Sequence, residues 1–472
     1  MERAVLLGSV HVAGRMAVGE VSFVRLKNFG TQMNRGKSKS RPYLSESNKM
    51  RTAKRSVLFI ALCLLSVSVY AQDTPLEAGL AVTRALAGGE SHSYQIKLQT
   101  GQFARFRLDQ QAIDAALRLN APDGKQLFEM SLTRAGEEES LSVEAAAAGN
   151  YTLTVVGKGG ASLRGEYRLT SSVSAAAMAQ DKQRLLAESL MLEAEQLAPQ
   201  AGKTAPQVIE STQKASAIWR ELNEPSWEAW ALLRMGRAYS DLSQREKAAE
   251  CYQQALNRYQ AVKNRGGEAE TYVRLGSAYT VWTQFDKALE SLQKALELSR
   301  AVKNRGAEGG TLTMLGQVYT YRGQPDKAIE CYVPALTLIR EAQDRRTEAI
   351  ALFSLGNAYL GQSKFEQALE VFEEARVISQ ELKNRSFEAA ALANLAAVYG
   401  NTSRTEKSIE YTEQALALFR EFKNRPSELT MLTNLGNAYL TLWQTEKAIP
   451  YFEQALLIAR EIKNRLEEGR AL

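Results

Sequence analysis

The sequence predicts a mainly α-helical solenoid, built from 40-residue repeats and preceded by a small all-β sandwich. Two observations carry this prediction. The triplet Lys-Asn-Arg recurs in phase with a 40-residue period, beginning at Lys263, Lys303, Lys383, Lys423 and Lys463. Self-similarity at such a period is typical of stacked repeat units. Residues 72–172 instead consist of short segments that alternate apolar and polar residues, separated by glycine-containing turns, which is the pattern of β-strands.

The first 71 residues predict an export signal. Residues 1–49 show no apolar periodicity, and we interpret them as a non-native or disordered extension ahead of a true start at Met50. From Met50 a basic start leads into an apolar run and then Val69-Tyr70-Ala71 before Gln72. This layout predicts a signal peptide over residues 50–71 with cleavage after Ala71. The expected location is therefore periplasmic or extracellular, with only transient membrane contact.

The charge of the chain argues against a nucleic-acid partner. The whole sequence carries a formal charge of +6, but 12 of the 59 basic residues and 3 of the 53 acidic residues lie in residues 1–71. The remaining residues hold 47 basic against 50 acidic side chains. Because the basic character belongs to the leader, the repeats lack the electrostatic footprint of a nucleic-acid-binding solenoid.

Residues 72–172 are expected to form about eight strands. Segments such as Tyr94–Leu98 and Tyr151–Val155 alternate in character, and turns such as Pro122-Asp123-Gly124 separate them. With Ser93-Tyr94, Gly101-Gln102, Pro122-Asp123-Gly124 and Gly149-Asn150-Tyr151, this segment resembles the bacterial pre-peptidase C-terminal type of sandwich. It contains no tryptophan to serve as a sugar-binding platform, so we expect a spacer or docking module.

Residues 173–223 connect the two regions. Residues 173–205 are rich in alanine, glutamine and glutamate, which predicts a linker helix. Val208, Ala215 and Trp219 lie forty residues before matching repeat positions, so the segment also contains a degenerate first unit that caps the solenoid.

Six full units follow over residues 224–464. Each contains Leu-Gly-x-x-Tyr or a close variant, with the glycine or its alanine substitute at 236, 276, 316, 356, 396 and 436. A small residue follows twelve positions later, and another follows seven positions after that. Small residues at this spacing allow two antiparallel helices to pack closely. The pattern resembles the tetratricopeptide repeat, although the unit is forty rather than about thirty-four residues long, a leucine or tyrosine replaces the usual tryptophan, and the terminal proline is missing.

The Lys-Asn-Arg triplet is expected to join successive units. Lysine suits the end of a helix, and asparagine suits a turn or the start of the next helix. A glutamate follows each arginine by three residues, so the two side chains can pair. An arginine ladder that holds an anionic partner is the alternative, but the spacing favours local ion pairs.

The resemblance implies a binding site. In the tetratricopeptide family the first helix of each unit lines the concave face. The matching positions here are Arg234, Arg237, Arg274, Ser277, Gln317, Asn357, Asn394, Asn434 and Asn437. Carboxamides both donate and accept hydrogen bonds, so they suit an extended peptide or protein segment, and the arginines would prefer anionic groups at one end. The alternative is a polar face that only contacts solvent.

No catalytic, metal or cofactor site is expected. After the leader the sequence contains two cysteines, Cys251 and Cys331, and one histidine, His92. We interpret the cysteines as small buried residues and His92 as a strand-surface residue. The arrangement of sandwich and repeats is similar to the N-terminal part of bacterial proteins that end in a caspase-like CHAT domain. That resemblance implies a second hypothesis, in which this chain is the regulatory part of a CHAT-type cysteine protease whose catalytic domain is absent. The first hypothesis is a non-enzymatic scaffold.

Residues 465–472 are expected to open a further repeat and to stop before its Leu-Gly-x-x-Tyr element. A solenoid end normally carries a polar capping helix. Without one, the face around Tyr451, Leu456 and Ile458 is expected to be uncovered, and the chain is expected to self-associate there or to continue.

Overall fold

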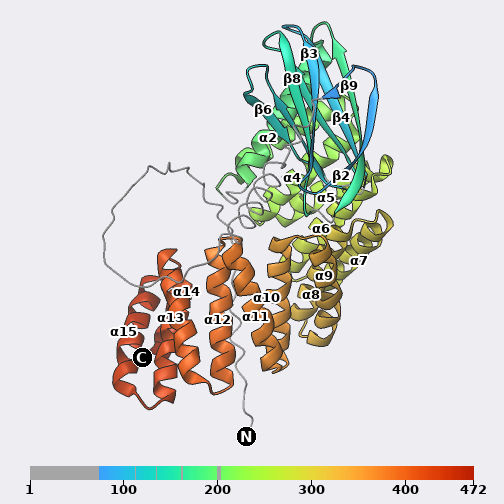
Figure 1. Cartoon of the computed structure of the whole chain (residues 1–472). Helices are drawn as coiled ribbons and strands as arrows, with labels where there is room; N and C mark the ends of the chain where they lie inside the picture. The colour runs from blue at the N-terminus through green and yellow to red at the C-terminus, as the bar shows by residue number, and fades with distance from the viewer. Residues whose placement is uncertain (1–73, 112, 134–135, 161–162, 199–202, 472) are drawn as a thin grey trace, which may run out of the picture.

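The computed structural model describes residues 74–111, 113–133, 136–160, 163–198 and 203–471. A β-sandwich stands at one end of a curved row of helices (Figure 1). The expected signal peptide, its cleavage site at Ala71 and the 1–49 extension lie outside the described residues. Within the described residues, the expected order of a small β region followed by a helical solenoid is confirmed.

The sandwich consists of two sheets. One has five strands in the order β1-β3-β8-β5-β6, and the other has four in the order β2-β9-β4-β7. Among the described strands, all pairs are antiparallel except β1 with β3. The strands are β1 (Thr74–Pro75), β2 (Ala81–Ala87), β3 (Ser91–Leu98), β4 (Phe103–Gln111), β5 (Ala115–Asn120), β6 (Gln126–Met130), β7 (Glu138–Glu144), β8 (Gly149–Gly157) and β9 (Arg164–Ser174).

Alternation along the strands sends one set of side chains between the sheets. In β4, Phe106 and Leu108 are fully buried, and in β3 the same holds for Tyr94 and Leu98. The sequence predicted His92 on the strand surface, and this was wrong. His92 is 7% exposed because its ring lies between the sheets, with Nδ1 2.8 Å from the Tyr167 hydroxyl, which also contacts the Tyr94 hydroxyl.

The solenoid consists of paired antiparallel helices, and α3 to α15 have 17 residues each. The second helices of the seven pairs are α3 (Ala205–Glu221), α5 (Arg245–Ala261), α7 (Phe285–Ala301), α9 (Pro325–Glu341), α11 (Phe365–Glu381), α13 (Thr405–Glu421) and α15 (Thr445–Glu461). The first helices are α2 (Ala179–Leu197), α4 (Pro225–Asp241), α6 (Arg265–Val281), α8 (Arg305–Tyr321), α10 (Arg345–Gly361), α12 (Arg385–Asn401) and α14 (Arg425–Thr441), and α16 (Arg465–Ala471) follows the last pair.

The repeated glycines lie where the two helices of a unit touch. A Cβ on Gly316 of α8 would lie 2.5 Å from Cε1 of Tyr332 on α9, and a Cβ on Gly356 would lie 2.5 Å from Cε1 of Phe372. Any larger side chain would push the two helices apart. The glycine therefore makes room for the aromatic ring of the same unit.

The turns between units follow the chemistry that the triplet predicts. The lysine adopts a left-handed conformation, as in Lys383 with φ of 53°, and ends the second helix. The asparagine caps the next helix, since Asn384 Oδ1 accepts a hydrogen bond from the amide of Phe387 at 3.2 Å. The arginine pairs with the buried glutamate three residues on, as Arg345 does with Glu348 at 2.8 Å.

Four of the arginines at this position also reach the next turn. The pairs Arg305–Glu341, Arg345–Glu381, Arg385–Glu421 and Arg425–Glu461 join positions 36 residues apart. The triplet arginines thus form an ion-pair ladder along one edge of the solenoid. This arrangement agrees with local pairing and leaves little reason to assign them an anionic partner.

The sandwich and the first helices share one hydrophobic core. Phe106 and Leu141 of the sandwich belong to the same buried cluster as Met191 of α2, Trp219 of α3 and Trp230 of α4. Helix α2, which the sequence suggested as a linker, also hydrogen-bonds to strand β7. Its Glu188 accepts from the Ser142 amide at 2.9 Å and from the Ser142 hydroxyl at 3.0 Å. Helices α2 and α3 pack together as the first, degenerate pair.

At the other end, α16 packs on α15. Ile458, which was expected to be uncovered, is 4% exposed and belongs to a core with Leu432 and Leu435 of α14. Tyr451 is half-buried and stacks on Tyr439, with ring centroids 5.5 Å apart. The exposed apolar side chains in this region are Leu440, Trp443, Ile449, Leu457 and Leu466 instead.

Candidate functional site

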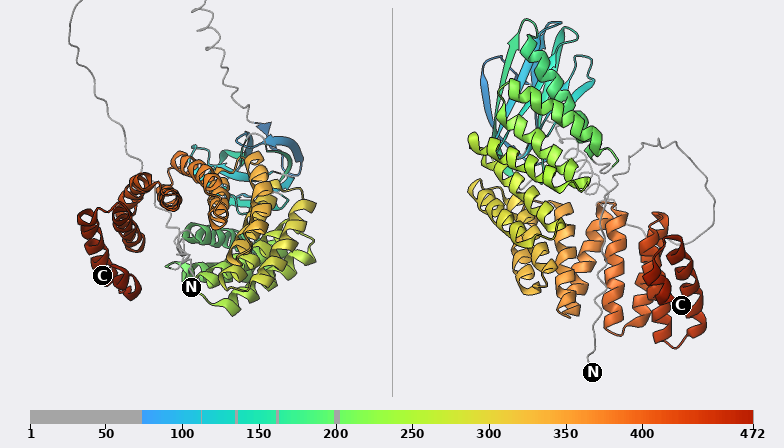
Figure 2. Two further views of the ribbon diagram at one scale, coloured as in Figure 1. Left: turned by 90° about the horizontal axis from the view of Figure 1, so that it is seen from below. Right: turned by 180° about the vertical axis from the view of Figure 1, so that it is seen from behind.

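The first helices of successive units form the inner face of the solenoid. Helices α4, α6, α8 and α10 contact one another across units, whereas successive second helices lie farther apart. A row of helices that are closer on one side must curve toward that side, and the end-on view of Figure 2 shows this arc. Below, "inner face" means the side-chain positions two before and one after the repeated glycine on these first helices.

Carboxamides on the inner face form pairs between neighbouring units. Gln317 Nε2 of α8 donates to Ser354 Oγ of α10 at 3.3 Å. One unit further on, Asn394 Nδ2 of α12 donates to Asn357 Oδ1 of α10 at 3.0 Å. All four side chains are half-buried. Each pair uses only part of the hydrogen-bonding capacity of its amides, so donors and acceptors remain for a ligand.

The remaining predicted amides are more open. Asn434 and Asn437 of α14 are exposed, and Ser277 of α6 is half-buried. Ala397 of α12 occupies the position that would pair with Asn434, so the row of amides is interrupted there. From unit to unit, the structure therefore brings Gln317, Asn357 and Asn394 into one continuous polar row, and leaves Asn434 and Asn437 at its end.

The three predicted arginines lie at the opposite end, where two of them are neutralised. Arg234 Nε lies 2.6 Å from Glu195 Oε1 of α2, and its guanidinium stacks 4.7 Å from the ring centroid of Trp230. Burial lowers the pKa of Arg234, although the charge of Glu195 opposes this effect. Arg274 Nε donates to Glu270 Oε1 at 2.7 Å on its own helix.

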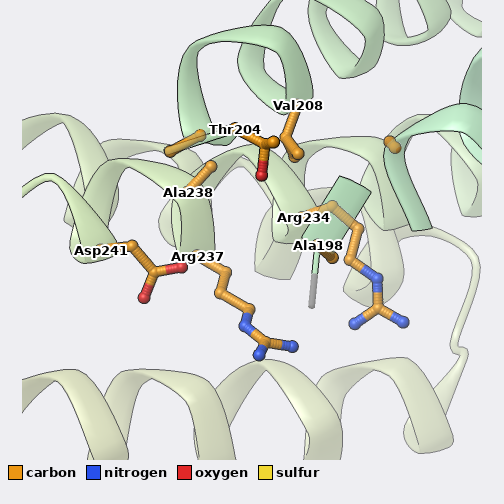
Figure 3. Close-up of a pocket in the computed structure, with 9 residues that line it drawn as sticks. Ala198, Thr204, Val208, Arg234, Arg237, Ala238 and Asp241 are labelled. Atoms are coloured by element: carbon orange, nitrogen blue, oxygen red, sulfur yellow. The ribbon is translucent and has the colours of Figure 1, made fainter. Parts of the chain in front are cut away.

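Arg237 is the exposed member of this group. It lines a small pocket between α2, α3 and α4, together with Thr204, Val208 and Asp241 (Figure 3). The volume open to a water-sized molecule is about 20 Å³, room for little more than one water. The three arginines therefore do not form a cluster of free cations. The expected preference of this end for an anionic ligand is not supported by their arrangement.

Sequence reasoning did not find a second hollow. It lies between the second helices α3 and α5, has side chains of α4 as its floor, and measures about 400 Å³. Lys247 and Tyr239 belong to its lining, with the ammonium 5.4 Å from the ring centroid. Because its walls are second helices, this hollow is separate from the inner face.

The described residues contain neither a membrane span nor a metal-binding cluster. No helix among them is long and apolar enough to cross a membrane. No group of three or more histidine, cysteine, aspartate or glutamate side chains there is arranged to hold a metal ion.

Comparison with known proteins agrees with this geometry. The tetratricopeptide repeat model matches residues 205–261, 229–301, 267–341, 307–381 and 387–461, which together exceed half of the chain. The chain belongs to the tetratricopeptide repeat family. The matches begin at α3, so the degenerate pair contributes one helix to the tetratricopeptide region. No curated protein matches the chain in sequence.

Solved tetratricopeptide structures are similar in fold alone. A signal-transduction ATPase with a tetratricopeptide repeat sensor from Pyrococcus horikoshii is 18% identical, with a TM-score of 0.49 over 61% of this chain and 46% of that chain. Aspartyl phosphate phosphatase F from Bacillus subtilis is 16% identical, with a TM-score of 0.45 over 60% of this chain and 72% of that chain. The apo quorum sensor NprR from B. thuringiensis is 15% identical, with a TM-score of 0.47 over 59% and 76%.

Proposed function

We propose that this tetratricopeptide protein is an exported scaffold that binds an extended peptide or protein segment along its inner face. The amide row formed by Gln317, Asn357 and Asn394 carries this proposal. A peptide main chain presents an amide donor and a carbonyl acceptor at each residue. Half-buried carboxamides on a curved, preformed surface can pair with both groups and lose little conformational entropy when they do.

The ligand is expected to bind without a net charge requirement. On α8, α10, α12 and α14, the inner face carries Met314, Gln317, Ser354, Asn357, Asn394, Ala397, Asn434 and Asn437, none of which is charged. Of the arginines on the neighbouring helices α4 and α6, Arg234 and Arg274 are paired with glutamates, and Arg237 is exposed. Recognition should therefore rest on main-chain hydrogen bonds and uncharged side chains, and it should depend only weakly on ionic strength.

A peptide library tests this function. The protein would be screened against random, unstructured peptides, and the tightest binders would be measured with the double variant Asn394→Ala/Asn434→Ala. Loss of two ligand hydrogen bonds should weaken binding by roughly tenfold or more. The matched control, Gln293→Ala/Gln414→Ala, removes two exposed carboxamides from the second helices α7 and α13 and should leave binding unchanged. Binding that is equal in both double variants would remove the inner face as the site.

Export is the second part of the proposal, and the leader of residues 50–71 supports it. Expressed in a bacterium from Met50, the protein should leave the cytoplasm and begin at Gln72. Mass spectrometry of the N-terminus measures this, and a protein that still begins at Met50 would contradict it.

Regulation of a CHAT-type cysteine protease remains the alternative function, supported by the order of sandwich and repeats. Within this chain, burial raises the pKa of the Cys251 and Cys331 thiols to about 11, so neither thiol supplies much thiolate at neutral pH. His92 lies in the sandwich and interacts with Tyr167. Reading the genomic sequence beyond codon 472 distinguishes this alternative, since a catalytic domain would have to be encoded there.

Self-association through α15 and α16 is the remaining partner proposal. Leu457 and Leu466 there are each 67% exposed, which supports it. Sedimentation over a range of concentrations should show dimers that Leu457→Glu abolishes. A protein that stays monomeric at the highest concentration would refute this contact.

A further inference from the structure

The β-sandwich lies along the edge of the solenoid where successive units are joined. This inter-unit edge consists of the turns α3–α4, α5–α6, α7–α8, α9–α10, α11–α12, α13–α14 and α15–α16. The sandwich stands above α4 to α9 and not above α12 to α15 (Figures 1 and 2). The contacts show that the two parts meet at more than one turn.

The first contact is at the α3–α4 turn. Glu224 Oε1 accepts hydrogen bonds from Arg105 of β4 at 3.1 Å and from Arg184 of α2 at 2.6 Å. One turn into α4, Trp230 Nε1 donates to the Leu132 carbonyl of the β6–β7 loop at 2.9 Å, and the indole is 3% exposed. These contacts fix the sandwich rigidly to the first complete unit.

Two further contacts lie one and three units away. At the α5–α6 turn, Asn264 Nδ2 donates to Glu137 Oε1 of the sandwich at 3.4 Å. At the α9–α10 turn, Gln343 contacts Gly160 of the β8–β9 loop. A Cβ on Gly160 would lie 1.9 Å from Gln343 Oε1 and 2.4 Å from Gln343 Cβ, so only glycine allows this approach.

The sequence of the turns carries a matching signal. The triplet is Lys-Asn-Arg at five of the seven inter-unit positions, from Lys263 to Lys463. It is replaced by Asn223-Glu224-Pro225 at the α3–α4 turn and by Gln343-Asp344-Arg345 at the α9–α10 turn. Both replacements lie at turns that the sandwich touches, whereas the third touched turn, α5–α6, keeps the triplet and uses its asparagine for the contact. A lysine at position 343 would bring a charge against the Gly159–Gly160 backbone, whereas glutamine presents a neutral amide.

From these contacts we propose that the β-sandwich is a brace that fixes the curvature of the solenoid from α4 to α9 and leaves the units from α10 onward free to bend. A solenoid held only by neighbouring units bends at each junction, because each unit contacts only the next. A rigid body attached at both ends of a three-unit stretch removes that freedom. The inner face beyond α10, which carries Asn357, Asn394, Asn434 and Asn437, can then widen or narrow around a ligand.

Paired spin labels test the brace. Asn257 and Thr337 lie two units apart on α5 and α9, and Val377 and Leu457 lie at the same repeat positions on α11 and α15. All four side chains are exposed. The labels would be attached to cysteines at these positions after replacement of the three native cysteines by alanine. In the otherwise unaltered chain, the 257–337 distance distribution should be about half as broad as that of 377–457.

A double-mutant cycle isolates the contact. Gly160→Ala should broaden the 257–337 distribution roughly twofold, to the width of the 377–457 pair, because the new Cβ separates the loop from the turn. Adding Gln343→Gly removes the side chain that the Cβ meets and should restore the narrow distribution. The 377–457 pair should not respond to either change.

Two results would overturn the proposal. Equal widths for the two pairs in the unaltered chain would show that the sandwich does not restrain the solenoid. A Gly160→Ala chain with an unchanged 257–337 distribution would show that the α9–α10 contact carries no restraint. Neither result depends on a ligand, so the brace and the peptide-binding function can fail independently.

Discussion

The two halves of the molecule are stabilised in different ways. In the N-terminal half, side chains from distant parts of the sequence share one core, as Phe106 does with Trp219 and Trp230. In the C-terminal half, the buried clusters run from one unit to the next along the row: one extends from α7 to α11, and another joins Phe372 of α11 with Leu395 and Val398 of α12. The first half should therefore unfold as one body, whereas the second should lose its units step by step. The same chain combines a globular domain and a linear array.

The largest effect should come from removing an aromatic anchor in each half. Trp219 and Phe372 are both fully buried. Replacing either by alanine should cost about 3–5 kcal/mol. Hydrogen exchange followed by mass spectrometry should show that Trp219→Ala exposes the sandwich and α2 to α4 together. Phe372→Ala should expose only α10 to α13. If Trp219→Ala left the sandwich protected, the shared core would not be a single cooperative unit.

The pH dependence of the two halves should have opposite signs. Burial raises the pKa of Glu139 and Glu188 in the N-terminal half to about 7, from an ordinary 4.5. Since the folded pKa exceeds the unfolded one, this stabilisation is complete below about pH 4.5 and is lost as the pH rises through 7. Each group contributes roughly 3 kcal/mol at most. In the ladder, a hydrogen bond from Arg425 lowers the pKa of Glu461, so that contribution is lost on acidification.

Denaturant unfolding at pH 5.5 and 8.5 measures this difference. The sandwich should be more stable against denaturant at pH 5.5 than at pH 8.5. The double variant Glu139→Gln/Glu188→Gln should reduce this dependence of stability on pH. A wild-type sandwich that is equally stable at both pH values would show that these carboxyl groups titrate near their ordinary pKa.

The smallest predicted effect is the difference in stability between substitutions at two glycines of helix α8. Both Gly316 and Gly310 lie in α8, but a Cβ on Gly316 meets the ring of Tyr332, whereas a Cβ on Gly310 has nothing within 4 Å. Gly316→Ala should destabilise the protein by about 1–3 kcal/mol. Gly310→Ala should stabilise it by about 0.5–1 kcal/mol. Thermal unfolding of both variants measures this difference. Equal shifts in the unfolding temperature would show that the two helices of a unit have room to separate.

Regular features of the chain were predictable from the sequence because they repeat. The helix pairs, the capping role of Asn384 and its equivalents, and the Arg345–Glu348 type of pair all follow from local spacing. Repetition turns a weak local signal into a strong one. The family and the fold class could be predicted for the same reason.

Features that depend on a single long-range contact were not predictable. Glu195, which neutralises Arg234, lies in the degenerate pair, where no repeat marks its position. His92 looked like an exposed strand residue because the Tyr167 partner comes from the other sheet, 75 residues away. The docking of the sandwich is marked in the sequence by one feature, the departures from Lys-Asn-Arg at Glu224 and Gln343. A departure from the triplet does not by itself identify what the turn contacts, so the docking could not be predicted from it.

The ion-pair ladder has a consequence for how such a protein can change its length. Arg345, Arg385 and Arg425 each join a glutamate 36 residues on, within the same 40-residue period. Insertion or loss of one whole unit beyond α10 would regenerate every pair at the new junction. Between α4 and α9 the sandwich spans a fixed number of units, and an added unit would carry Gln343 away from Gly160. The sandwich thus fixes the number of units between α4 and α9 at three. Relatives of this protein should therefore differ in repeat number in the array beyond α10.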